Sequence, residues 1–227
     1  MKISAVDLTT IYILTMDMVL IGFLLEVLKR TGASATFRLV MGSVLAGWLT
    51  VLYLGISGKW LFPANIAGFS FFTIVILGVV AVSAVMLFFP PLKKHLFAAP
   101  QELLLLLQGL RMFLGAGWLI ESTLGIMPKY FGIADGITHI TAAFLALKAA
   151  ILYARGDRNR GELWFANLFG LLDIVVVGLG ISFVMLKDIG PYHNVMYALF
   201  FVAPIFIGLH FVSLLKLVQI KKDRAEE

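Results

Sequence analysis

Residues 66–89 read IAGFSFFTIVILGVVAVSAVMLFF, a run that contains no charged side chain. At about 1.5 Å of rise per residue, a helix of this length exceeds the hydrocarbon core of a bilayer, which is about 30 Å thick. Pro63 precedes the run and Pro90 follows it, and proline is typical of the ends of such segments. The stretch therefore predicts a helix that crosses a membrane.

Six further apolar stretches are about as long, so the chain contains seven predicted membrane helices. Their predicted ranges are 8–28, 38–57, 66–89, 102–124, 131–154, 163–186 and 195–217. Hydrophobic residues make up 61% of the 227 residues and charged residues only 14%, which is too few polar groups for a soluble protein surface. The predicted fold is all-α: an integral membrane bundle that forms a single transmembrane domain over residues 1–227, in contact with the lipid bilayer.

The charges of the loops predict the orientation of the bundle, because cytoplasmic loops of membrane proteins are enriched in Lys and Arg. Of the 18 basic residues, four lie at the side of the N-terminus, and two, Arg111 and Lys148, lie inside predicted helices. The other twelve share the opposite side: Lys29, Arg30, Arg38, Lys93, Lys94, Arg155, Arg158, Arg160, Lys216, Lys221, Lys222 and Arg224. We expect the N-terminus outside, the C-terminus in the cytoplasm and a location in the cytoplasmic (inner) membrane. Basic residues spread over alternate loops do not form a nucleic-acid-binding face.

Several kinds of chemistry are disfavoured. The chain has no Cys, so thiolate metal sites and disulfides are excluded. The only Lys of the last helix is Lys216, at its end rather than at its middle as in a retinal protein. His139 and His210 differ in depth by about 12 Å, which disfavours a haem b with two histidine ligands. We therefore expect no cofactor and no metal; no catalytic motif is present, although an intramembrane enzyme that uses Asp and His stays open.

Ionisable side chains at membrane depth are the informative positions, because each costs about 2.5–3.5 kcal/mol at a helix centre and is rarely kept without a partner or a cavity. Asp17, Arg111 and Asp173 lie near the middle of the first, fourth and sixth predicted helices. In a low dielectric, a guanidinium and a carboxylate are expected to turn toward each other. Polar and small residues share one helical face with Arg111 by their spacing: Gln108, Gly115, Trp118 and Ser122.

Further polar groups lie above and below this level. Asp135 and His139 are four residues apart on one helix face, within reach of each other, and Glu121 lies in the same outer half. The inner half holds Gln108, Asn167 and His210. Such a series of carboxylates and histidines is typical of a pathway for protons or cations. A buried ion pair that only fixes the packing of the helices, or a cavity that binds a ligand, would have the same sequence pattern.

The second half of the chain resembles a group of small, uncharacterised bacterial inner-membrane proteins with seven helices. The resemblance covers about residues 101–217 and rests on four segments: Gln108 to Arg111, Gly132 to His139, Trp164 to Asp173, and Pro204 to His210 followed by Ser213-Leu214. In that family's pattern Gln108, Arg111, Asn167, Asp173, Pro204 and His210 match recurrent positions. His139 departs from it, since an aliphatic residue is usual there. The resemblance implies a fold but no activity.

Two functions are compatible with these observations. The first is a small-solute or proton-coupled transport protein whose central polar cavity is lined by Asp17, Arg111 and Asp173, with His210 and Asn167 at an inner gate. The alternative is a ligand-binding membrane sensor or accessory subunit that does not transport. The expected partner is a small molecule or an ion, and a second copy of the chain or a membrane partner protein are further candidates; the substrate is not specified by the sequence.

Overall fold

The computed structural model describes residues 4–157 and 159–223, and this part of the chain is helical, without β-strands. Seven helices are long and apolar enough to cross a membrane, as expected. Three of them are continuous near the N-terminus: α1 (Ala5–Arg30), α2 (Ala35–Ser57) and α3 (Gly68–Phe88). Each begins and ends within a few residues of its predicted range. Ser4 and Ser34 cap the N-terminal ends of α1 and α2, because their hydroxyls accept hydrogen bonds from backbone N–H groups.

Three of the four remaining long helices are interrupted. The fourth consists of α5 (Gln101–Gln108) and α6 (Arg111–Thr123), and the fifth is the continuous α7 (Lys129–Ala154). The sixth joins α8 (Arg160–Gly180), the π-helical segment η1 (Ile181–Met185) and α9 (Leu186–Ile189). The seventh joins α10 (Val195–Tyr197), the π-helical segment η2 (Ala198–Val202) and α11 (Ala203–Asp223). The ends differ from the predicted ranges by a few residues, whereas the interruptions were not predicted.

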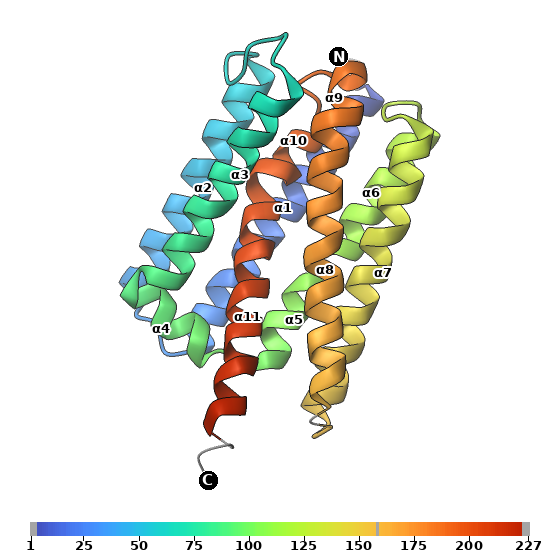
Figure 1. Ribbon diagram of the computed structural model, residues 1–227. Helices are drawn as coiled ribbons and strands as arrows, with labels where there is room; N and C mark the ends of the chain where they lie inside the picture. Colours follow the sequence, from blue (N-terminus) through green and yellow to red (C-terminus); the bar gives the residue numbers. More distant parts are fainter. Residues whose placement is uncertain (1–3, 158, 224–227) are drawn as a thin grey trace.

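The seventh helix is the centre of the bundle. In its most apolar stretch 78% of the residues are buried, compared with 22% in α2 and 28% in α3. In Figure 1, α11 and α1 run through the middle, α2 and α3 lie on one side, and α6, α7 and α8 lie on the other. The described ends of the chain lie at opposite ends of the bundle (Figure 1), as an odd number of long helices requires.

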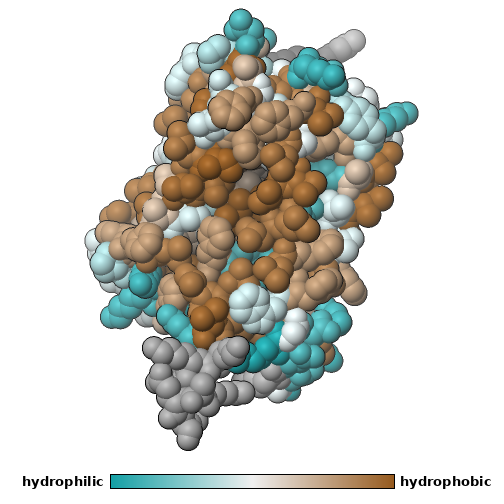
Figure 2. All heavy atoms as spheres, in the orientation of Figure 1, coloured by the Kyte–Doolittle hydropathy of each residue, from teal (hydrophilic) through white to brown (hydrophobic). Residues whose placement is uncertain are grey.

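The surface of the bundle has the pattern of a lipid-facing protein. Many large hydrophobic side chains are exposed, among them Leu39, Phe69 and Phe88, each more than 70% exposed. Figure 2 shows hydrophobic residues across the middle of one face and hydrophilic residues toward both of its ends. In water such a surface would be unfavourable, whereas in a bilayer it matches the solvent.

A short helix that the sequence analysis placed in a loop is α4 (Pro90–Ala98). Pro90 and Pro91 occupy its first turn, where a proline loses no hydrogen bond because these N–H groups have no intrahelical acceptor. Leu92 and Leu96, four residues apart, are buried against the bundle, while Lys93 is exposed. The helix is amphipathic and lies at the end of the bundle near the turn between α1 and α2 (Figure 1).

Candidate functional site

Arg111 and Asp173 form the centre of the polar interior. Arg111 is the first residue of α6 and only 1% exposed; one of its terminal nitrogens, Nη2, donates to Oδ2 of Asp173 on α8. The other, Nη1, donates to the backbone carbonyl of Gly170 at 2.9 Å. The guanidinium is therefore held by two groups that are one turn apart on the same helix, and the predicted pairing of these two charges is confirmed.

His139 joins Asp173 to a second carboxylate. Its Nδ1 atom lies 2.9 Å from Oδ1 of Asp135, one turn earlier on α7, and 3.0 Å from Oδ2 of Asp173. We call Arg111, Asp135, His139 and Asp173 the charge cluster. Its two carboxylates face one guanidinium and one imidazole, so the cluster is electrically neutral when His139 is protonated and carries one negative charge when it is not.

Small residues permit the close approach of α6 and α7 that brings His139 to Arg111. A Cβ at Gly115 would lie 2.6 Å from the backbone oxygen of Gly136 and 3.0 Å from the Cβ of His139. Distances this short leave no room for a methyl group in a close-packed interior. The close contact therefore requires glycine at both positions, Gly115 on α6 and Gly136 on α7.

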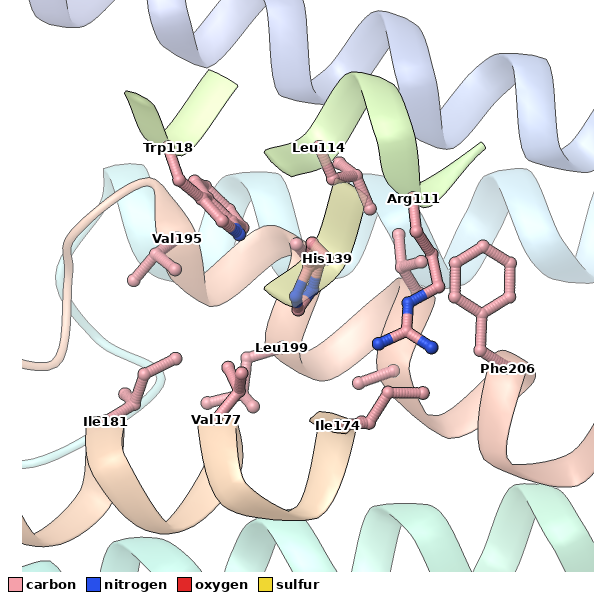
Figure 3. A pocket seen from close by; sticks show the side chains of 13 residues that line it. Arg111, Leu114, Trp118, His139, Ile174, Val177, Ile181, Val195, Leu199 and Phe206 are labelled. Atoms are coloured by element: carbon pink, nitrogen blue, oxygen red, sulfur yellow. The ribbon is translucent and has the colours of Figure 1, made fainter. Parts of the chain in front are cut away.

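A central cavity of about 30 Å³ adjoins the charge cluster. Figure 3 shows Arg111, His139 and Trp118 on one side of it, with Ile174, Val177 and Ile181 opposite. The indole Nε1 of Trp118 is buried and has no hydrogen-bond partner in the described part of the chain. A cavity of this volume with polar groups in its wall has room for a water molecule but not for an organic ligand.

The interruptions of three long helices meet around this cavity. Gly109 and Leu110, directly before Arg111, donate to the carbonyls three residues back, at 3.0 and 3.2 Å, as in a 3₁₀ turn. Ile181 of η1 and Leu199 of η2 line the cavity. Pro204 follows η2 and cannot donate the backbone hydrogen bond that a regular α-helix would need there. π-Segments and 3₁₀ turns inside helices are frequent at functional sites.

Below the cluster lies an inner group formed by Gln108, Asn167 and His210, all at most 1% exposed. His210 Nδ1 is 3.0 Å from Oδ1 of Asn167, and the Asn167 amide donates to the Leu163 carbonyl at 2.8 Å. His210 Nε2 has no partner among the described residues, and Gln108 Nε2 donates to the Phe206 carbonyl at 3.3 Å. The structure thus pairs two of the inner residues that the sequence singled out.

Gly170 links the inner group to the charge cluster. A Cβ at this position would lie 2.7 Å from Nε2 of His210 and 3.0 Å from Nη1 of Arg111. The two side chains therefore pack against the same glycine, and the inner group is continuous with the cluster.

Above the cavity lies an outer group formed by Thr9, Glu121 and Asn194. Glu121 is fully buried and accepts a hydrogen bond from Nδ2 of Asn194, which also lies 2.8 Å from Oγ1 of Thr9. Oε2 of Glu121 has no partner in the described part of the chain. Asn194 was missed by the sequence analysis because it lies just before the predicted last helix. No signal in its neighbourhood distinguishes it from a loop asparagine.

Asn194 is buried but also lines a hollow of about 770 Å³ together with Asp7, Lys59 and His193. Its neighbour Val195 lines the central cavity. His193 Nε2 lies 3.1 Å from the Ile126 carbonyl, and its Nδ1 accepts the backbone N–H of Val195 at 3.2 Å. Burial lowers the pKa of His193, and the bond to Ile126 opposes this effect in part.

Asp17 does not join the other charges. Its side chain is fully buried in α1, and neither carboxylate oxygen has a hydrogen-bond partner among the residues that the structure describes. It forms no ion pair with Arg111 and does not line the central cavity. Of the three charges that were expected to meet, only Arg111 and Asp173 are in contact.

A metal ion is a further possibility for the charge cluster. Asp135, His139 and Asp173 each offer one ligand atom, and these atoms lie within 4.8 Å of one another. Imidazole and carboxylate are ordinary ligands of zinc. However, Arg111 already neutralises Asp173, and a dication would lie beside the guanidinium in a poorly screened interior. The donor set therefore suits a proton better than a divalent metal.

Comparison with known proteins gives a family but no activity. No curated protein and no solved structure matches the chain. A family model described as a domain of unknown function, DUF8737, matches residues 68–218. The match runs from α3 into α11 and includes the charge cluster, the inner group, Glu121 and Asn194, but not Asp17 or Thr9. Because it covers more than half of the chain, the protein belongs to the DUF8737 family.

Proposed function

We propose that the protein carries protons across the cytoplasmic membrane, alone or coupled to a small solute, through the interior of its seven helices. The N-terminus is placed outside and the C-terminus in the cytoplasm, from the distribution of basic residues along the sequence. The proposal depends on one observation above all: His139 lies 2.9 Å from Asp135 and 3.0 Å from Asp173 beside a cavity with room for water.

The charge cluster has the composition that reversible proton binding needs. Imidazole and carboxylate both exchange protons, whereas Arg111 keeps its charge and so compensates Asp173 permanently. One proton added to His139 changes the cluster from a net charge of −1 to 0. Such a change of charge in a low-dielectric interior is the kind of event that favours one helix arrangement over another.

The helix interruptions support movement at the same place. The 3₁₀ turn before Arg111 and the segments η1 and η2 all border the cavity, and local departures from α-helical hydrogen bonding are common where helices bend. We infer that protonation of the cluster is coupled to bending of these helices, which opens the cavity alternately toward the outer and inner groups.

The size of the cavity restricts what passes through this conformation. About 30 Å³ holds a water molecule, and proton transfer along water and side chains needs no more space. A coupled organic solute would require the cavity to expand.

The test is proton flux into liposomes that contain the purified protein and a pH-sensitive dye, driven by an imposed membrane potential. We expect flux with the natural sequence and loss of most of it in His139→Gln, Asp135→Asn and Asp173→Asn. His95→Gln is the matched control, because His95 lies on α4 away from the cavity, and it should retain full flux. Absence of flux under any gradient, or equal flux in the cluster variants, would reject the proposal.

A second candidate is a ligand-binding or accessory subunit that does not transport. Its support is the tight packing around Arg111, whose guanidinium is bound to both Asp173 and the Gly170 carbonyl. This arrangement also fits a fixed structural pair. Failure of proton flux together with stoichiometric co-purification of a membrane protein would favour this candidate.

A further inference from the structure

A second cavity, of about 240 Å³, lies between α2 and α3. It is lined by aliphatic side chains, methionines and Trp48, with contributions from α1, α2, α3, α4 and α11. We call it the α2–α3 pocket. It shares no lining residue with the central cavity, so it is a separate site.

The α2–α3 pocket opens on the side of the bundle, between two of its helices. Val44 on α2 and Val85 on α3 line it and are 58% and 51% exposed, whereas Leu28 and Leu96 line it and are 3% and 2% exposed. The two valines therefore mark its mouth, and the leucines of α1 and α4 its floor. A protein immersed in a bilayer presents such an opening to lipid chains rather than to water.

Basic residues gather near the turn between α1 and α2 and on α4, at one end of the pocket. From Val27 to Gln101 the sequence contains no Asp or Glu. Glu26 pairs with Arg30 at 2.9 Å and with Lys29 at 3.7 Å. Three further cations of this stretch, Arg38, Lys93 and Lys94, have no carboxylate partner within the described residues.

Each of these three cations lies within three residues of one that lines the pocket. Arg38 precedes Met41 by one turn of α2, and Nε of Arg38 is buried without a hydrogen-bond partner among the described residues. Lys93 follows Leu92 on α4 and lies over the ring of Phe97, 5.6 Å from its centroid.

The helix α4 carries Lys93 and Lys94 and packs beside the start of α2, which carries Arg38. His95 Nδ1 is 3.1 Å from the Thr31 carbonyl in the turn between α1 and α2, and the rings of His95 and Phe37 are 5.7 Å apart. An amphipathic helix that buries leucines and exposes lysines is typical of the level of the lipid headgroups.

We propose that the α2–α3 pocket holds one acyl chain of an anionic phospholipid, whose phosphate is bound by Arg38, Lys93 and Lys94. The proposal rests on the membrane insertion and orientation proposed above, which place these cations at the cytoplasmic surface, where anionic lipids attract basic side chains. The chain supplies the packing contacts that an empty apolar pocket would lack, and the unpaired cations supply the selectivity for an anionic headgroup.

Native mass spectrometry of the detergent-purified protein tests this site directly. The protein is titrated with phosphatidylglycerol or phosphatidylcholine of identical acyl chains. We expect one phosphatidylglycerol to be retained in preference to phosphatidylcholine. Replacing Arg38, Lys93 and Lys94 by Gln should weaken the preference roughly fivefold for each cation removed. Arg155→Gln, an exposed cation of the same predicted side but outside the pocket, should leave it unchanged.

A second pair of variants tests the chain-binding part. Val85→Trp fills the mouth of the pocket and should abolish retention of both lipids. Val80→Trp is its matched control, because Val80 lies on the same helix, is 57% exposed and does not line the pocket. Equal retention of the two lipids by the unaltered protein, or full retention by Val85→Trp, would overturn the proposal. Lipid retention is measured independently of proton flux. A failure to retain lipid therefore leaves the proton proposal intact, and an absence of flux leaves the lipid proposal intact.

Discussion

Gly170 on α8 packs directly against the imidazole of His210 on α11: a Cβ at residue 170 would lie 2.6 Å from Cε1 and 2.7 Å from Nε2. The same Cβ would lie 3.0 Å from Nη1 of Arg111, which is bonded to the Gly170 carbonyl. One glycine therefore sets the distance between the inner group and the charge cluster, in a place where neither neighbour is exposed to solvent.

We expect Gly170→Ala to destabilise the protein by about 1–3 kcal/mol, because overpacking a close-packed interior forces side chains and backbone to shift. The thermal unfolding midpoint in detergent is the measurement. Gly178→Ala is the matched control on the same helix. It is buried too, but a Cβ there has no atom within 4 Å, so the better helix propensity of alanine should make it neutral or stabilising. Equal midpoints for the two variants would contradict the packing argument.

Asn194→Leu should destabilise the protein by about 1–3 kcal/mol, because it leaves the buried carboxylate of Glu121 without its donor. Thr9 loses its contact with the Asn194 amide at the same time. The effect is again read from thermal unfolding in detergent. Asn65→Leu, at an exposed position of the loop between α2 and α3, should change the midpoint little. A similar small change for Asn194→Leu would mean that the outer group contributes nothing to stability.

Periodicity along a helix predicted part of the site well. Gln108, Arg111, Gly115, Trp118 and Ser122 were assigned to one face, and all five are buried. The spacing of four residues predicted a contact between Asp135 and His139, and Oδ1 of Asp135 lies 2.9 Å from Nδ1 of His139. Such predictions succeed because the geometry within one helix is fixed by its backbone.

Relations between helices were less predictable. Asp17 was expected at a depth similar to that of Arg111, but depth does not specify how each helix is rotated about its axis. Asp17 has no hydrogen-bond partner among the described residues. The partners of Asn194 come from α1 and α6, so spacing along one helix could not indicate them. The segments η1 and η2 depend on backbone hydrogen bonds that leave little trace in hydrophobic periodicity.

His193 predicts a pH dependence of stability at the outer end of the bundle. Burial lowers its pKa below the ordinary value of about 6.5. Between the lowered pKa and that value the unfolded chain binds more protons than the folded one, so stability should rise as the pH rises through this window and be lost as the pH falls. Protonation would also remove the lone pair by which Nδ1 accepts the Val195 N–H.

The measurement is the unfolding midpoint in detergent between about pH 5 and pH 7, the range in which histidine titrates. We expect His193→Gln to have a flatter profile than the natural sequence. Asn65→Gln, at an exposed position of the loop between α2 and α3, is the control; it changes no titratable group and should keep the original slope. Identical profiles for the natural sequence and His193→Gln would show that His193 does not titrate differently in the two states.

The ion pair of Arg111 and Asp173 should dominate the stability of the charge cluster. Arg111→Met and Asp173→Asn each leave a buried charge without its partner, and each should cost about 3–5 kcal/mol. The double variant removes both charges, so it should cost less than the sum of the two single variants, with a coupling energy of about 1–3 kcal/mol.

Lys148→Met and Glu162→Gln provide the matched control, because that ion pair is 2.9 Å long but its side chains are 45% and 30% exposed. Its coupling should not exceed about 1 kcal/mol. If the buried pair showed no more coupling than the exposed one, Arg111 would be stabilised by the Gly170 carbonyl and its surroundings rather than by Asp173, and the charge balance on which the proton proposal depends would no longer hold.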